Sequence, residues 1–208
     1  MSDVDLGGAV APPRKGRAAL FVAIPMALAM VLLVAVLVTR SNATDKAAFT
    51  PLQDKPAPEI AGTTLDGKAF DLDAFRGDWV AVNFLASWCV PCLQEHPFLE
   101  SFARRQEQAG NHVHLVSIVF GDTADNVKKF FAENGGEWPV VTGDEGKIAL
   151  DYSVVQVPET YIIDPAGIVR ERVSGPLRSP DELDNRIGDL ITKLYPTDTD
   201  PAPSTTGR

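Results

Sequence analysis

The sequence predicts an α/β domain that follows a separate apolar segment at the N-terminus. Two apolar runs of strand length, residues 79–86 and 113–120, are each followed by a longer segment with apolar residues at helical spacing, residues 89–108 and 123–134. Strands that alternate with helices in this way are typical of α/β domains. The N-terminal segment, residues 18–38, stands apart because no polar face interrupts it.

The composition limits the classes of function. The chain has 208 residues, of which 45% are apolar, so it can form one domain with a substantial core plus appendages. Its formal net charge of −9 argues against nucleic acid as a partner, because binding DNA or RNA requires a basic surface. Both cysteines lie in one Cys-x-x-Cys motif, so no structural disulfide can form elsewhere in the monomer.

Residues 18–38 are predicted to form a transmembrane helix that serves as a signal anchor. The segment has no charge, and about 20 helical residues span the ~30 Å hydrocarbon core of a bilayer. Three basic residues in the tail of residues 1–17 outweigh Arg40 on the other side, which predicts a cytoplasmic tail and an extracytoplasmic domain. A cleaved signal peptide, with its cleavage site at residues 41–43, is the alternative.

Residues 39–56 are predicted to be a linker, and residues 196–208 a disordered tail. The linker contains Pro51 and Pro56 and no hydrophobic periodicity, and the tail is rich in Pro, Thr and Asp. As a flexible coil, the linker would keep the domain within roughly 25 Å of the membrane. We therefore expect the folded domain over residues 57–195, outside the cell membrane, where disulfide chemistry is permitted.

Turn and capping signals predict the remaining elements. Asp66-Gly67 predicts a tight turn between two strands within residues 60–72. Thr123 is placed to cap the helix that follows it, and Ser179-Pro180 supplies a cap and a first-turn proline for a helix over residues 179–194. The other elements expected are a strand at 138–142, a helix at 146–152, and strands at 160–164 and 168–174.

The Cys-x-x-Cys motif lies where the apolar run of residues 79–86 gives way to a helix. Cys89 and Cys92 therefore fall in the first turn, and Pro91 fits there because a helix start does not need its missing N–H. The N-terminus of a helix carries partial positive charge and free N–H groups, which stabilise a thiolate. Since a thiolate is the attacking species in disulfide exchange, the motif predicts a dithiol–disulfide centre.

A metal site is the alternative interpretation of this motif. His96 extends it to Cys-x-x-Cys-x-x-x-His, but a structural zinc site usually has four protein ligands, and no fourth candidate lies nearby in the sequence. We expect His96 to be a helix-surface or packing residue. His112 and His114 point to one side of a strand without a third ligand, and we expect them at the surface. No metal is expected, and no cofactor other than the disulfide itself.

Two longer motifs resemble thioredoxin and, more closely, its membrane-anchored branch of TlpA/ResA-like reductases and CcmG (DsbE) proteins of cytochrome c biogenesis. They are NFLASWCVPCLQEH at residues 83–96 and VPETYIIDPAGIVRERVSG at residues 157–175. The resemblance covers residues 57–195 and implies a thioredoxin-like α/β fold, with a central mixed sheet flanked by helices. Residues 121–156 resemble the extra helix and strand that this branch inserts into the fold.

The resemblance also implies roles for residues of the redox centre. Cys89 is expected to be the exposed nucleophile, and Cys92 the buried thiol that resolves the mixed disulfide. Pro158 matches the family's cis-proline, so the backbone of Val157 would face the cysteines and pair with a substrate chain as an added strand. Trp88 is expected either to cover the sulfur pair or to pack in the core, and both interpretations stay open.

Glu95 and Glu159 are the candidates for an acid/base that serves Cys92. Asn83 stands where thioredoxin itself has a buried aspartate, and an amide cannot exchange a proton. Glu95 lies three residues after Cys92 on the same side of the helix, and Glu159 follows the cis-proline. Both match acidic residues that line the groove in the CcmG group, and the alternative is a solvated surface carboxylate. Carboxylates near the thiolate would raise its pKa and make the dithiol a better reductant.

The sequence therefore predicts a membrane-tethered thiol:disulfide oxidoreductase that acts as a reductant outside the cytoplasmic membrane. By resemblance, its substrates would be oxidised Cys-x-x-Cys-His sites of apocytochromes c. Two cysteines and one membrane helix cannot carry electrons across the membrane, so a membrane dithiol donor, CcdA- or DsbD-like, is implied. The alternatives are a thiol oxidant that introduces disulfides into exported proteins, a copper chaperone that uses the two cysteines, and peroxide reduction.

Overall fold

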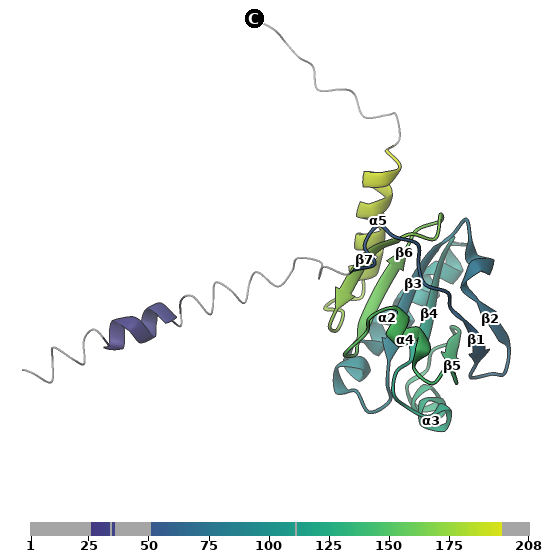
Figure 1. Ribbon diagram of the computed structural model, residues 1–208, viewed down its shortest axis with the longest axis horizontal. Helices are drawn as coiled ribbons and strands as arrows, with labels where there is room; N and C mark the ends of the chain where they lie inside the picture. The colour runs from purple at the N-terminus through teal and green to yellow at the C-terminus, as the bar shows by residue number, and fades with distance from the viewer. Residues whose placement is uncertain (1–25, 34, 36–50, 111, 197–208) are drawn as a thin grey trace, which may run out of the picture. The chain divides into compact units, whose positions relative to one another are not determined.

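In the computed structural model, a seven-stranded sheet forms the centre of the domain (Figure 1). The structure describes residues 26–33, 35, 51–110 and 112–196. The chain divides into two compact units, Met1–Lys46 and Ala47–Arg208, and every strand among the described residues belongs to the second.

The first unit is described only at residues 26–33 and 35, which are helical and exposed. They fall within the transmembrane segment predicted for residues 18–38. Among the described residues, no helix combines the length and the apolar character needed to cross a bilayer. The other predictions for the ends of the chain, namely the rest of that segment, the tail of residues 1–17, the linker at 39–50 and the tail from 197, lie outside the described residues.

The sheet is mixed, as the resemblance implied. Its strands are β1 (Ala61–Thr64), β2 (Ala69–Asp71), β3 (Trp79–Leu85), β4 (Val113–Val119), β5 (Val140–Thr142), β6 (Glu159–Ile163) and β7 (Val169–Ser174). Their order across the sheet is β2-β1-β5-β4-β3-β6-β7. The pairs β3–β4 and β4–β5 are parallel, whereas β1–β2, β1–β5, β3–β6 and β6–β7 are antiparallel.

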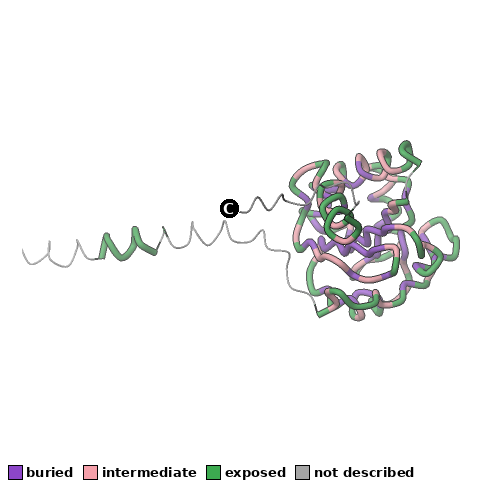
Figure 2. The backbone as a smooth tube through the Cα atoms, turned by 90° about the horizontal axis from the view of Figure 1, so that it is seen from above, coloured by how far each residue is buried: buried purple, intermediate pink, exposed green. Residues whose placement is uncertain are grey.

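Side chains of β3 alternate between two cores, one on each face of the sheet. Ala81 and Leu85 point to the core that contains helices α2 (Val90–Gln108) and α5 (Glu182–Leu194). Val82 and Phe84 point to the core that contains α4 (Lys147–Asp151). Helix α3 (Ala124–Asn134) belongs to the first core, and a short 3-10 helix, η1 (Leu72–Phe75), borders the second. Figure 2 shows the buried residues concentrated in the interior of the domain.

The capping predictions are confirmed at one helix and wrong at another. The side chain of Thr123 accepts a hydrogen bond from the backbone N–H of Asn126 and caps α3, as expected. Helix α5 begins at Glu182, three residues after the predicted cap Ser179. The backbone N–H of Glu182 donates to the carbonyl of Ser179, so this segment forms a turn before the helix starts. A serine–proline pair suits such a turn as well as a helix cap.

The end of the predicted linker is part of the folded domain. The N–H of Asp54 donates to the carbonyl of Val169, and the N–H of Val169 donates to the carbonyl of Lys55. The N–H of Ala57 donates to the carbonyl of Gly167. The last residues of the expected linker therefore contact the sheet edge: residues 51–54 form a turn, and Pro56 forms a bridge with Ile168.

Candidate active site

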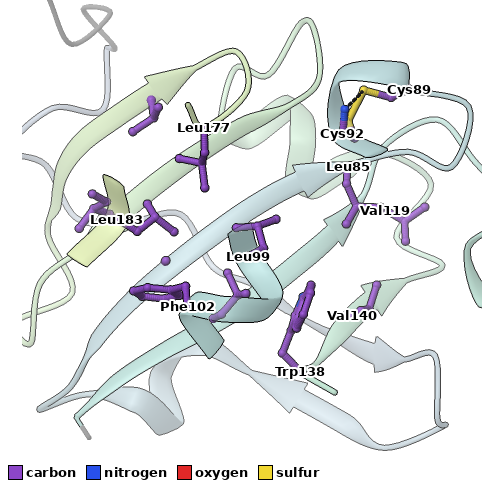
Figure 3. Close-up of a cluster of buried hydrophobic side chains, with 14 of the residues drawn as sticks. Leu85, Cys89, Cys92, Leu99, Phe102, Val119, Trp138, Val140, Leu177 and Leu183 are labelled. Atoms are coloured by element: carbon purple, nitrogen blue, oxygen red, sulfur yellow. Dashed lines mark hydrogen bonds between the residues drawn. A yellow bond between two sulfur atoms is a disulfide. The ribbon is translucent and has the colours of Figure 1, made fainter. Parts of the chain in front are cut away.

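The two cysteines form a disulfide at the junction between β3 and α2 (Figure 3). Cys89 is the N-cap residue of α2, and the backbone N–H of Cys92 lies 3.1 Å from its Sγ atom. The position at the helix start is the one that the sequence predicted. There Cys89 lies beside an amide donor and the positive end of the helix dipole. The backbone therefore stabilises a thiolate at Cys89.

Both sulfurs are buried in this disulfide form. Cys89 is 4% exposed and Cys92 is 2% exposed, so the expectation of an exposed Cys89 beside a buried Cys92 does not hold for the oxidised protein. The reason lies in the neighbouring loop: the carbonyl oxygen of Val157 is 3.6 Å from Cys89 Sγ. The peptide bond between Val157 and Pro158 is cis, which confirms that prediction and the prediction that this loop faces the cysteines.

Trp88 lies at the surface beside the disulfide. Its side chain is 59% exposed, which excludes packing in the core, and its indole N–H donates to the carbonyl of Gly121 at 3.2 Å. Val90, which lies between the two cysteines, and Leu93, which follows the second, are also exposed. The rim of the redox centre is therefore apolar, and a partner that covers it gains the free energy of burying that surface.

Glu95 is a buried carboxylate on the same helix as the cysteines. It is 1% exposed, so the alternative of a solvated surface residue is wrong. The side-chain amide of Asn83 donates to Oε1 at 2.9 Å, and the backbone N–H of Leu177 donates to Oε2 at 2.9 Å. Burial raises the pKa of Glu95 from 4.5 to about 7, although both hydrogen bonds act in the opposite direction. Glu95 can therefore gain or lose a proton near neutral pH.

Asn83 connects Glu95 to a buried chain of polar groups. Its amide also donates to Thr160 Oγ1 at 3.1 Å, and its carbonyl oxygen lies 3.5 Å from the Ser117 hydroxyl. The indole N–H of Trp138 donates to that hydroxyl at 2.8 Å. These contacts fix the orientation of the Asn83 amide, and through it the orientation of the Glu95 carboxylate.

Glu159 does not join this group. It is fully buried, and both of its oxygens accept hydrogen bonds from the guanidinium of Arg172. Its neighbour Thr160 points toward Asn83 and Glu95, so Glu159 itself points to the other face of the sheet. The expectation that Glu159 lines the groove beside Cys92 is therefore not supported by the geometry, which pairs it with a cation instead.

Comparison with known proteins agrees with this geometry. The sequence matches the AhpC/TSA family over residues 54–172. The chain belongs to the AhpC/TSA family. It is similar to the thiol:disulfide interchange protein HelX of Rhodobacter capsulatus, with 36% identity over 145 residues that cover 68% of this chain and 78% of HelX. It is also similar to the thiol-disulfide oxidoreductase ResA of Bacillus thuringiensis subsp. konkukian, with 28% identity over 142 residues, 68% of this chain and 78% of ResA.

A solved structure of a thiol:disulfide interchange protein has a similar fold. The thiol:disulfide interchange protein of Chlorobium tepidum TLS superposes with a TM-score of 0.58 and 27% sequence identity, covering 66% of this chain and 96% of that chain. The resemblance to the TlpA/ResA and CcmG branch and the thioredoxin-like fold are confirmed. With its Cys89–Cys92 disulfide, the chain is an enzyme of the thiol:disulfide oxidoreductase class.

The three histidines of this AhpC/TSA domain pack against other side chains or contact polar groups of the protein. His96 is buried among aromatic rings, and its Nε2 lies 2.9 Å from the carbonyl oxygen of Gly135, which confirms a packing role. Burial lowers the pKa of His96, so the ring is neutral at neutral pH. His112 and His114 both contact the Asp78 carboxylate, a partner that the sequence analysis missed. Within the described residues, no cluster of three or more potential ligands could hold a metal ion.

Asp122 is a second residue that the sequence analysis missed. It lies in the turn between β4 and α3, and its Oδ2 accepts a hydrogen bond of 2.7 Å from the backbone N–H of Ser87. Ser87 is two residues before Cys89, so Asp122 contacts the turn that presents the nucleophile. The sequence Gly-Asp-Thr before a helix is a capping signal, and nothing in it indicates a contact with residues 35 positions earlier.

Proposed function

We propose that the chain is a membrane-tethered reductant of protein disulfides outside the cytoplasmic membrane. The observation that carries the proposal is Glu95, a buried carboxylate with a pKa of about 7 on the helix that holds both cysteines. Such a group can accept a proton from a buried thiol and return it later, which a cycle of disulfide exchange requires.

The reaction starts from the dithiol form of the protein. The Cys89 thiolate attacks one sulfur of a substrate disulfide, the S–S bond breaks, and the second substrate sulfur leaves as a thiolate that takes a proton. Cys92 then gives its proton to Glu95 and attacks Cys89 Sγ. The bond between Cys89 and the substrate breaks, the remaining substrate sulfur leaves as a thiolate that takes a proton as Glu95 gives up its own, and the substrate is released as a dithiol. Two electrons pass to the substrate, and the protein ends with the Cys89–Cys92 disulfide seen here.

The contacts of Cys89 support a polypeptide substrate. The carbonyl of Val157 lies beside the sulfur at 3.6 Å, and the backbone of that loop can pair with an extended chain. The exposed side chains of Trp88, Val90 and Leu93, close to the cysteines in the chain, offer apolar surface. A flexible segment around a substrate cysteine can contact both at once.

We infer that the substrates are oxidised Cys-x-x-Cys-His sites of apocytochromes c, which must be reduced before haem attachment. The support is the resemblance of residues 83–96 and 157–175 to the CcmG group. The similar proteins HelX and ResA are named for thiol:disulfide exchange, and that chemistry is common to both. A thiol oxidant uses the same exchange steps in reverse, so the direction rests on the reduction potential.

The proposed anchor is the apolar segment of residues 18–38, with the basic tail in the cytoplasm. The anchor holds the domain beside the membrane, next to a membrane dithiol protein of the CcdA or DsbD kind that would return Cys89–Cys92 to the dithiol form. Both cysteines of the chain lie in the domain, so electrons from the cytoplasm need such a carrier.

The test is to trap partners with Cys92→Ala in the full chain, expressed in a host membrane. We expect mixed disulfides through Cys89, with captured proteins that contain Cys-x-x-Cys-His sites and with a membrane dithiol protein. The matched variant Cys89→Ala should capture neither. Adducts through Cys92 would reverse the assigned roles, and capture of proteins without such sites would remove cytochrome c from the proposal. A reduction potential well above about −180 mV would make the protein an oxidant.

A further inference from the structure

The turn that presents Cys89 is tied to the turn that begins α3. The backbone N–H of Ser87 donates to Asp122 Oδ2 at 2.7 Å, and the indole N–H of Trp88 donates to the carbonyl of Gly121 at 3.2 Å. Two successive residues before the nucleophile therefore bind two successive residues before the helix. The first of these bonds joins an amide to a charged group, which makes it the stronger of the two.

The carboxylate of Asp122 is also held from its own side. Its Oδ1 accepts hydrogen bonds from the backbone N–H of Thr123 at 2.7 Å and from the side-chain amide of Asn126 at 3.0 Å. Burial alone would raise the pKa of Asp122, but the hydrogen bonds from Ser87, Asn126 and Thr123 outweigh it and lower the pKa below its ordinary value. Asp122 is therefore a fixed anion throughout the pH range in which a thiol ionises.

This anion lies within reach of the Cys89 sulfur. One residue, Trp88, separates Ser87 from Cys89, so the carboxylate and the sulfur are on the order of 10 Å apart. At that separation and at partly buried positions, two negative charges repel each other by an amount that shifts a pKa by about 0.5 to 1. The repulsion opposes the helix N-terminus and the Cys92 N–H, which both favour the thiolate.

We propose that Asp122 is a positioning residue of the redox centre: it fixes the turn that presents Cys89, and its charge disfavours the Cys89 thiolate. The thiolate belongs to the dithiol form, so making it less stable shifts the pair toward the disulfide and makes the protein a stronger reductant. The inference deepens the proposed function, on whose direction it rests, by naming a residue that sets that direction.

The pH dependence of the effect identifies its origin. When the pH is well below the pKa of Cys89, the reduced pair consists of two neutral thiols, and the charge of Asp122 has no anion to repel. As the pH rises through the Cys89 pKa, the effect grows to its full size. Glu95 on α2 also titrates in this range, and the Glu159–Arg172 pair lies across the sheet. These groups are shared by the wild-type protein and its Asp122 variants, so the comparison isolates Asp122.

The experiment compares the full chain in detergent with Asp122→Asn, which removes the charge and keeps a hydrogen-bond acceptor. Alkylation rates against pH give the pKa of Cys89, and equilibration with dithiothreitol buffers gives the potential at pH 5 and pH 8.5. We expect the Cys89 pKa to fall by about 0.5 to 1. The potential at pH 8.5 should become less negative by up to about 30 mV, which corresponds to a tenfold change in the equilibrium constant. At pH 5 the two potentials should coincide.

Asp125→Asn is the matched control, because it removes the same charge from an exposed residue three positions further along the chain. It should leave the pKa and both potentials unchanged. Asp122→Ser, which removes the charge and keeps a side-chain oxygen as acceptor, is a second variant with the expected result of Asp122→Asn. Unchanged values in both Asp122 variants, an equal shift at pH 5, or the same shift in Asp125→Asn would each overturn the proposal. The proposed function instead depends on the wild-type potential and the trapped partners, so the two can fail separately.

Discussion

Glu95 and Glu159 lie on opposite faces of the sheet. Glu95 is bonded to Asn83, and Glu159 is opposite Phe84 in the register of β3 and β6. Successive residues of a strand point to opposite faces, so Asn83 and Phe84 assign the two carboxylates to different cores. Glu95 shares the core of Cys92, whereas Glu159 shares a buried ion pair with Arg172.

Replacing Glu95 by Gln should slow the step in which Cys92 releases the substrate, because the amide cannot take the Cys92 proton. We expect a loss of about 10²-fold at pH 8, in the range that positioned acid/base groups contribute. Stopped-flow measurement of thiol release from a preformed mixed disulfide checks this. The wild-type rate should rise through a pH of about 7, the pKa of Glu95, and the variant should lack that rise. Glu107→Gln, an exposed site on the same helix, is the control.

The same substitution should change how stability depends on pH. The pKa of Glu95 is raised on folding from 4.5 to about 7, so the folded state binds this proton more tightly than the unfolded state. The free energy of unfolding of the wild-type protein should therefore fall by about 3 kcal/mol as pH rises through that window. Urea unfolding of the oxidised protein at pH 4.5 and pH 8 measures it. If the free energy of unfolding fell by the same amount between pH 4.5 and pH 8 in the wild-type protein and in Glu95→Gln, the raised pKa of Glu95 would be contradicted.

Replacing Arg172 by Met should destabilise the domain by about 3 kcal/mol or more, because it leaves the buried Glu159 without its cation. Chemical unfolding measures the loss. Glu159→Gln combined with Arg172→Met removes both charges and should recover part of it. Since the pair lies on the face away from the disulfide, the reduction potential of the folded variants should stay at the wild-type value. A shift of the potential would return Glu159 to the redox centre.

Replacing Trp88 by Ala should weaken substrate binding with little effect on stability. Its side chain is 59% exposed, so the free energy of unfolding should change by no more than about 0.5 kcal/mol. The loss of apolar contact with a bound chain should raise KM for a protein disulfide by about tenfold. Steady-state reduction of an unfolded disulfide protein tests this. Ile191→Ala, at an exposed position on α5, should leave KM unchanged.

Replacing His96 by Ala tests the copper-chaperone alternative. The ring packs against Phe130, Phe131 and Trp138, so its removal should cost about 2 kcal/mol of stability. It should leave metal uptake by the reduced protein unchanged, as measured by elemental analysis after gel filtration. Stoichiometric metal in the wild-type protein that disappears in His96→Ala would favour the chaperone.

The sequence allowed prediction of the features that depend on local spacing. The start of α2 at the cysteines, the cap at Thr123 and the turn at Asp66-Gly67 each depend on neighbouring residues, and all are confirmed. The cis bond before Pro158 followed from a resemblance to known proteins.

Other features depend on contacts between distant segments. The face on which Glu159 lies is decided by a register in which a shift of one residue reverses every side chain. The burial of Glu95 depends on the loop that brings the Leu177 N–H to its carboxylate, 82 positions away. The contact of Asp122 with Ser87 depends on how β3 and β4 align. No local pattern indicates any of these three.

Residues 54–57 pair with residues 167–169, at the start of β7, the last strand of the sheet. An uncovered strand margin is a template on which other chains can add, and proteins that expose one tend to self-associate. A shortened protein that starts at Glu59 would keep every strand and helix of the second unit and lose this cover. Preparations for crystallisation or spectroscopy should therefore begin upstream of Asp54, because we expect the loss of this cover to favour self-association.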